Sequence, residues 1–425
     1  MIVGLQDLGD HHTDMSGDLE KATVASTTPP RRGVHNVVLF GAGASFDAGI
    51  PLLNSFVDKM WEYAIRGKAR GVALSSADQE LLSRANDIRL ELERFNSRAY
   101  FDGRNLENIL SLLAFEALAG ESSAQKYEAL VRAVGRTIEL SCEIPHEQKP
   151  TPAIDAAHNY WLFWIALLGG HLRGTFPALI TFNYDLVFER TLWRFFHLLR
   201  EGSAKPNVKS CRLNYSFGQN SCAFKMVDYT VNLEAARHGF EAQAGFKAEV
   251  ICDRTAPVEV EIPYLKLHGS LNWHRNRPEG WPTSLPMEAV DNPLILPPVF
   301  NKMDAKTVDG IWKTALDCLR EAKHIIIVGY SLPRTDIYMQ YFLKAAVGPN
   351  SNLQNIFVFD PLLFQDGNDS LEMQKRYKEC FAPQFTNRIS FRPLANYSPG
   401  PAHNGTFFHF VHALERAPDA LLFSP

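Results

Sequence analysis

The stretch VVLFGAGAS at residues 37–45 decides the expected fold, because an apolar run that suits a buried strand passes directly into a glycine-rich turn. Three further apolar runs lead into short polar motifs, namely ITFNYD at 180–185, YLKLHGS at 264–270 and IIIVGYSL at 325–332. In an open α/β sheet, ligands bind outside the carboxyl ends of the strands. The four motifs therefore predict one shared ligand-binding crevice.

The carboxyl-terminal part of the chain alternates between strand and helix signals. Strands are expected at 324–328, 356–359 and 389–392, and helices at 306–322, 336–346, 372–380 and 406–416. Such alternation is typical of a parallel sheet that is covered on both faces. We therefore predict an α/β fold with a Rossmann-like parallel sheet covered by helices.

Two long segments interrupt this pattern. Helical periodicity over about 54–173 predicts a large helical insertion, and short alternating runs over about 201–262 predict a smaller β-rich insertion. Residues 1–33 are polar and have little to bury, so we expect a tail followed by one domain over 34–425.

Composition and charge exclude several classes of protein. The net charge of -4 gives no general basic field, so we expect no direct sequence-specific binding of nucleic acid. No two of the six cysteines are spaced as CxxC, so we expect no zinc, and dispersed thiols favour a cytoplasmic location. The apolar run YWLFWIALLGG at 160–170 is too short to span a bilayer and predicts a buried helix, so no membrane partner is expected. The amino terminus does not resemble a secretory signal.

The glycine loop is ambiguous when it is considered alone. Gly41 and Gly43 permit a tight turn and a close approach of backbone to phosphate, with helix-start amides directed at the anion. The dinucleotide fingerprint G-x-G-x-x-G has its third glycine where this chain has Phe46, and no Walker lysine-serine pair follows. A tight turn that binds nothing explains the loop equally well.

Asn183 and His268 each have two interpretations. Asparagine favours the amino termini of helices, so Asn183 alone is best explained as a helix cap. His268 ends an apolar run and precedes a glycine. It is either a hydrogen-bonded histidine at a strand end or an imidazole at a pocket mouth that serves as a general base.

The combination of motifs is more specific than any one of them. GAGAS with a following Gly-Ile-Pro at 49–51, then TFNYD, KLHG and VGYSL, occur in the order found in sirtuin-like proteins. Over about 34–360 the chain resembles the divergent bacterial branch of that NAD-binding superfamily, which includes NAD-depleting effectors of antiphage defence. The resemblance implies that the chain binds NAD and cleaves the bond between nicotinamide and ribose.

The resemblance also implies a role for each motif residue. Asn183 would orient the ribose and the attacking water, His268 would accept a proton from a ribose hydroxyl or from water, and Asp185 would hold the nicotinamide carboxamide. Two further sets of residues would contact the rest of the cofactor. Those near the pyrophosphate would be Gly41, Ala42, Gly43 and Ser45, and those near the adenosine would be Gly329, Ser331 and Asp360.

Departures from the family select among possible reactions. Protein-deacetylating sirtuins carry a four-cysteine zinc module, which is missing here, and an acid-aromatic-arginine triplet where this chain has Leu52-Leu53-Asn54. These differences favour an NAD+ glycohydrolase, in which water replaces the acyl oxygen as nucleophile. Two alternatives stay open: an NAD-dependent protein deacylase or ADP-ribosyltransferase, and a non-catalytic module that senses NAD or another nucleotide.

The added segments also suggest an assembly. The tail and the two insertions are expected to bury no core of their own, and such additions often make contacts between subunits. We therefore expect a homo-oligomer. The resemblance implies a gating partner, for example a DNA-translocating ATPase.

Overall fold

The computed structural model describes most of the chain between residues 36 and 416. The described ranges are 36–95, 101–144, 154–169, 176–198, 208–217, 220–230, 244–253, 255–275, 286–296, 308–334, 336–364, 367–391 and 406–416. The chain divides into two units, Met1–Arg32 and Gly33–Pro425, and all described residues belong to the second. The predicted polar tail at 1–33 lies outside the described residues.

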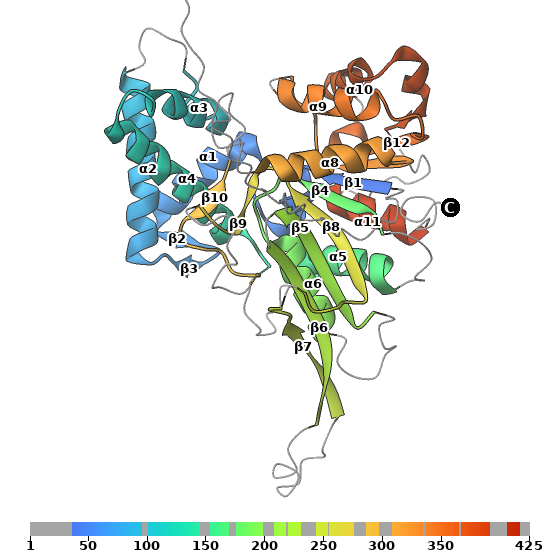
Figure 1. The fold of residues 1–425 in the computed structure, drawn as a ribbon. Helices are drawn as coiled ribbons and strands as arrows, with labels where there is room; N and C mark the ends of the chain where they lie inside the picture. The colour runs from blue at the N-terminus through green and yellow to red at the C-terminus, as the bar shows by residue number, and fades with distance from the viewer. Residues whose placement is uncertain are drawn as a thin grey trace, which may run out of the picture. The chain divides into compact units, whose positions relative to one another are not determined.

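A large sheet organises the second unit (Figure 1). It has nine strands in the order β13-β12-β11-β1-β4-β8-β5-β6-β7. Their bounds, in sheet order, are Ile389–Ser390, Asn355–Phe359, His324–Val328, Asn36–Phe40, Ala178–Thr181, Val260–Lys266, Ser210–Phe217, Asn220–Thr230 and Ala244–Val250. Neighbours are parallel from β13 to β5, whereas β6 and β7 are antiparallel. The predicted α/β fold with a Rossmann-like sheet is confirmed, and the sheet is mostly, not wholly, parallel.

The β-rich insertion extends this sheet and does not form a separate excursion. β5 pairs in parallel with β8, and β6 and β7 continue the sheet beyond β5. The alternating run at 258–262, expected within the insertion, supplies the first half of β8, whose second half pairs with β4. Alternation alone could not reveal this, because it indicates a strand and not its partner.

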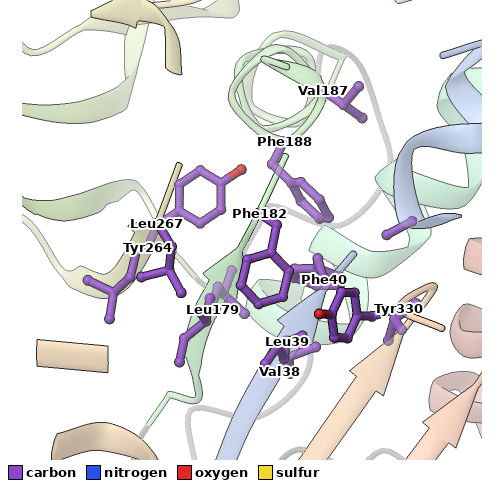
Figure 2. Packing of buried hydrophobic residues seen from close by; sticks show 14 of the residues in the cluster. Val38, Leu39, Phe40, Leu179, Phe182, Val187, Phe188, Tyr264, Leu267 and Tyr330 are labelled. Atoms are coloured by element: carbon purple, nitrogen blue, oxygen red, sulfur yellow. The ribbon is translucent and has the colours of Figure 1, made fainter. Parts of the chain in front are cut away.

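Helices cover both faces of the sheet (Figure 1). The helices are α5 (Ile154–Trp164), α6 (Val187–Leu198), α8 (Asp309–Glu321), α9 (Ile337–Val347), α10 (Asn368–Cys380) and α11 (Thr406–Arg416). Phe40 of β1 contacts the rings of Phe163 of α5, Phe188 of α6 and Phe410 of α11, so these three helices share one face of the sheet. Figure 2 shows Phe40, Phe182 and Phe188 in this core.

The predicted buried helix at 160–170 is confirmed in the part of it that is described. Tyr160, Phe163 and Trp164 are fully buried, and a short π-helical turn (Ile165–Gly169) continues α5. No helix among the described residues is long and apolar enough to cross a membrane.

The helical insertion is shorter than predicted, because α5 packs on the sheet. It consists of α1 (Leu53–Arg66), α2 (Ser76–Phe95), α3 (Leu106–Glu116) and α4 (Glu121–Ser141), with a small hairpin of β2 (Lys68–Ala69) and β3 (Val72–Ala73). The insertion has a buried interior that includes Met60, Leu82 and Leu113. The expectation that it buries no core was wrong, so it gives no argument for a homo-oligomer.

The remaining short elements shape the loops around the sheet. They are β9 (Gly269–His274), which pairs with β10 (Pro293–Ile295), and three 3-10 helices, Ala42–Ala48, Pro361–Phe364 and Pro383–Arg388.

Candidate functional site

The adjacent strands β12, β11, β1, β4 and β8 end at the same level of the sheet. The register pairs Phe40 with Val328 and with Thr181, and it pairs Thr181 with Lys266. Val328 in turn pairs with Phe359. The segments after these strands therefore meet along one edge, where a cavity of about 810 Å³ lies. Strand order also reverses around β1, the arrangement at which open α/β sheets bind ligands.

All but one of the predicted site residues line this cavity. Those that line it are Ala42, Gly43, Ser45, Asn183, Asp185, His268, Gly329, Ser331 and Asp360. Gly41 is not among the lining residues, and its carbonyl oxygen accepts a hydrogen bond from the Asn183 side chain instead. The four motifs thus come together as the sequence predicted.

The glycines of two motifs are required by the contact between their loops. A Cβ atom on Gly41 would clash with the Gly329 carbonyl oxygen, and one on Gly43 would lie 2.9 Å from the Gly329 Cα. Gly329 has a φ of +66°, and a Cβ there would clash with the Ala44 nitrogen. The glycines therefore allow close packing of the β1 and β11 loops, which was not anticipated.

Internal hydrogen bonds occupy several amides of the glycine loop. Gly41 N donates to Val328 O, Gly43 N to Gly329 O and Ala44 N to Gly41 O, each at 2.9 Å. Each of these amides already donates one hydrogen bond within the protein, so their expected contact with a pyrophosphate stays a prediction. Of the predicted loop residues, Ala42 and Ser45 donate none of these three bonds, and both line the cavity.

Asn183 does not cap a helix. Its Nδ2 donates to Gly41 O at 2.9 Å and to Ser45 Oγ at 2.8 Å, so its side chain turns toward the glycine loop. The cap of α6 comes instead from Asp185, whose Oδ1 accepts a hydrogen bond from Val187 N at 3.0 Å. Because the Asn183 amide uses Nδ2 for these bonds, its Oδ1 is the atom that can accept a hydrogen bond from a ligand hydroxyl or water.

His268 lies in an aromatic group beside the cavity. Its ring centroid is 5.3 Å from that of Phe182 and 6.0 Å from that of Trp312 of α8. Its backbone is fixed on both sides, because Leu296 N donates to its carbonyl oxygen and Gly269 adopts a φ of +91° with no room for a Cβ. The backbone position of His268 is thus constrained by the tight turn between β8 and β9.

Asp360 follows β12 at the far end of the cavity. It is 8% exposed, and its Oδ1 accepts a hydrogen bond from Leu362 N at 3.0 Å. Burial raises the pKa of Asp360 to about 6, although that hydrogen bond and the nearby Arg376 oppose the shift. Neighbouring Ser331 is held by its carbonyl oxygen, which accepts from the Arg376 guanidinium at 3.1 Å.

The helical insertion supplies a second wall that the sequence did not reveal. Most of its lining side chains from α1, α3 and α4 are apolar and buried, and these are Phe56, Leu106, Leu110, Val131, Val134 and Ile138. Helical spacing of leucines in α3 was visible in the sequence. Nothing in that spacing says which element the apolar face will meet.

The cavity is acidic. Glu107 of α3 and Asp336, the cap of α9, line it together with Asp185 and Asp360, and no described lining residue is lysine or arginine. Burial, and next the charge of Asp336, raise the pKa of Glu107. Tyr330 donates its hydroxyl proton to Asp336 Oδ2 at 2.6 Å. Such walls favour cationic and hydroxyl-rich parts of a ligand, and leave anionic parts to neutral donors.

Metal ligands do not gather in the described part of the chain. No group of three or more His, Cys, Asp or Glu there is arranged to hold a metal ion, and all six cysteines are free thiols. The expected lack of zinc stays a prediction.

Comparison of the chain with protein-family models found no match, and comparison with curated proteins found none. The functional argument therefore depends on the geometry of this cavity.

Proposed function

We propose that the protein is an NAD+ glycohydrolase that releases nicotinamide and ADP-ribose. One observation carries the proposal: Asn183 and His268 follow adjacent strands and line the same cavity, which extends across the sheet edge to Asp360. This is the order in which the motifs of sirtuin-like proteins would meet the two halves of NAD.

The reaction needs little general-acid catalysis. The pyridinium nitrogen carries a positive charge that the bond cleavage removes, so nicotinamide leaves as a neutral molecule. The protein must orient the ribose, stabilise an oxocarbenium-like centre and deliver water. Asn183 Oδ1 would hold a ribose hydroxyl or the water, and His268 would accept the proton. The acidic walls would stabilise the positive charge of the reacting sugar.

The apolar wall favours hydrolysis over protein deacylation. Helices α1, α3 and α4 line part of the cavity with buried side chains such as Leu110 and Val134. A deacylase needs an open groove there for a peptide. Buried apolar side chains occupy that part of the cavity, which supports a site that admits NAD and water.

Product analysis tests the proposal directly. Purified protein is incubated with NAD, with and without an acetylated peptide, and the products are separated by chromatography. Equal release of nicotinamide and ADP-ribose without peptide is expected. Release only with peptide would support the deacylase, and binding of NAD without any cleavage, in the presence of its cellular partners, would support a sensing module.

We also propose a homo-oligomeric, partner-gated effector of antiphage defence that acts in the cytoplasm. The support is the family resemblance alone. Light scattering tests the assembly, and a mass near the 47.8 kDa of one chain would contradict it. NAD levels in cells that carry the chain with and without its genomic neighbour, such as a DNA-translocating ATPase, test the gating. Equal depletion in both would contradict it.

A further inference from the structure

A fully buried ion pair lies behind the candidate site. Lys266 of β8 and Glu189 of α6 are both 0% exposed, and Lys266 Nζ is 3.1 Å from Glu189 Oε1. The same ammonium donates a hydrogen bond to the backbone oxygen of Asp185 at 2.5 Å. Lys266 precedes His268 by two residues, and Asp185 follows Asn183 by two. One ammonium group therefore ties the two predicted catalytic segments together.

A chain of buried hydrogen bonds extends the pair past the His268 turn. Tyr215 donates to Glu189 Oε1 at 3.1 Å, and Asn272 Nδ2 donates to the Tyr215 oxygen at 3.3 Å. Ser270 Oγ then donates to Asn272 Oδ1 at 2.7 Å. The network thus contacts β8 before His268 and β9 after it.

Stability does not explain why the network contains charges. Removing two charges from water is costly, and well-packed apolar residues in place of a buried pair are often as stable or more so. Burial raises the pKa of Glu189 even though Lys266 opposes the shift. Glu189 Oε2 has no hydrogen-bond donor among the described residues. An apolar pair would pack here, but it could not hold the Asp185 carbonyl.

We infer that Lys266 is a positioning residue that fixes the Asn183–Asp185 segment relative to His268, and that Glu189 holds the Lys266 side chain in place. The inference rests on the proposed function for its catalytic consequence. Its structural content is independent: without the ammonium, the segment after β4 keeps the backbone bond from Leu271 N to the Tyr184 oxygen, but it loses the bond from Lys266 at Asp185.

A double substitution separates positioning from stability. Lys266→Met and Glu189→Leu singly each leave one buried charge, so both single variants should melt well below wild type. Lys266→Met/Glu189→Leu together should recover most of the melting temperature. In this double variant we expect kcat for NAD cleavage to stay at least about tenfold below wild type with little change in KM, because the loss concerns alignment in the transition state. Amides at 184–186 should exchange hydrogen faster than in wild type.

The control is a second ion pair away from the cavity lining. Arg136→Met/Asp78→Leu removes the pair between α4 and α2, whose Nε–Oδ1 distance is 2.6 Å, and should leave kcat unchanged. A Lys266/Glu189 double variant with wild-type kcat and unchanged exchange at 184–186 would overturn the inference. If wild-type protein cleaves no NAD, the proposed function fails, and the exchange measurement alone decides: faster exchange supports positioning and unchanged exchange overturns it.

Discussion

The two walls of the cavity are built in different ways. One wall follows the carboxyl ends of five adjacent strands, and its polar groups are held by directed bonds, as when Asn183 Nδ2 donates to Gly41 O and Ser45 Oγ. The other wall comes from α1, α3 and α4, and it meets the cavity mainly with buried apolar side chains such as Leu110. We therefore expect the polar wall to carry the groups of the proposed reaction and the apolar wall to exclude water from the cavity.

The largest effect is expected on the polar wall. Asn183→Ala and His268→Ala should each lower nicotinamide release by about 10²–10⁴, because removing a general base or the group that orients its substrate typically costs that much. Circular dichroism should show an intact fold, since neither residue belongs to an apolar strand. Exposed His158 offers a matched control, and His158→Ala should keep full activity. Full activity in His268→Ala would remove His268 from the proposed chemistry.

The apolar wall should respond in stability and not in chemistry. Leu110 is 3% exposed, so Leu110→Ala should lower the free energy of unfolding by about 2–5 kcal/mol. Denaturant titration measures this, with Leu118→Ala as control because Leu118 is 59% exposed. At denaturant concentrations below the unfolding midpoint, the kcat of Leu110→Ala should change far less than that of Asn183→Ala. A large loss of kcat with unchanged stability would contradict the division between the walls.

A smaller effect, on stability, is expected from the buried carboxyl of Asp360 in the polar wall. The folded protein raises the pKa of Asp360 from 3.8 to about 6, so the folded state holds this proton more tightly than the unfolded state does. Stability is therefore lost from this group as the pH rises from about 4 to 6. Asp360→Asn should match wild type at pH 4 and exceed it at pH 7.5 by up to about 3 kcal/mol, at about 1.4 kcal/mol per pKa unit. Urea titrations at both pH values measure the difference in unfolding free energy between Asp360→Asn and wild type. Asp87→Asn, at an exposed position, is the control. The same difference at pH 4 and at pH 7.5 would contradict the raised pKa of Asp360.

The smallest effect concerns metal, which neither wall is expected to need. Elemental analysis should find far less than one zinc per chain, and EDTA should leave nicotinamide release unchanged. One tightly held zinc per chain would contradict this and would favour the deacylase.

The sequence predicted the polar wall well because its signals are local. Each motif residue follows the last residues of an apolar run, and parallel register brings those ends together without further information. The strand at 324–328 and the helix at 406–416 have the predicted bounds. The local sequence did not predict the hydrogen-bond partners. Asp185, and not Asn183, caps α6, because the Asn183 side chain donates to the glycine loop 142 residues away.

The apolar wall and the full extent of the sheet could not be predicted from the sequence, because they depend on contacts between distant segments. The leucines of α3 show a helix with an apolar face, but whether that face meets the sheet, another helix or a cavity is decided by tertiary packing. Similarly, residues 258–262 alternate as a strand, and only their pairing with β5 makes them part of the main sheet. The acidic character of the cavity was missed because Glu107 reaches it from the insertion.

Helix α11 has a consequence for the order in which the site can form during synthesis. Asp47, beside the glycine loop, accepts a hydrogen bond from Phe408 N at 2.8 Å across 361 residues, and Thr406 and His409 line the cavity. A ribosome-bound chain that has exposed the Asn183 and His268 motifs still lacks this part of the wall. These two motifs are thus translated long before the cavity can be completed, and a growing chain cannot complete this cavity until residues 406–409 emerge.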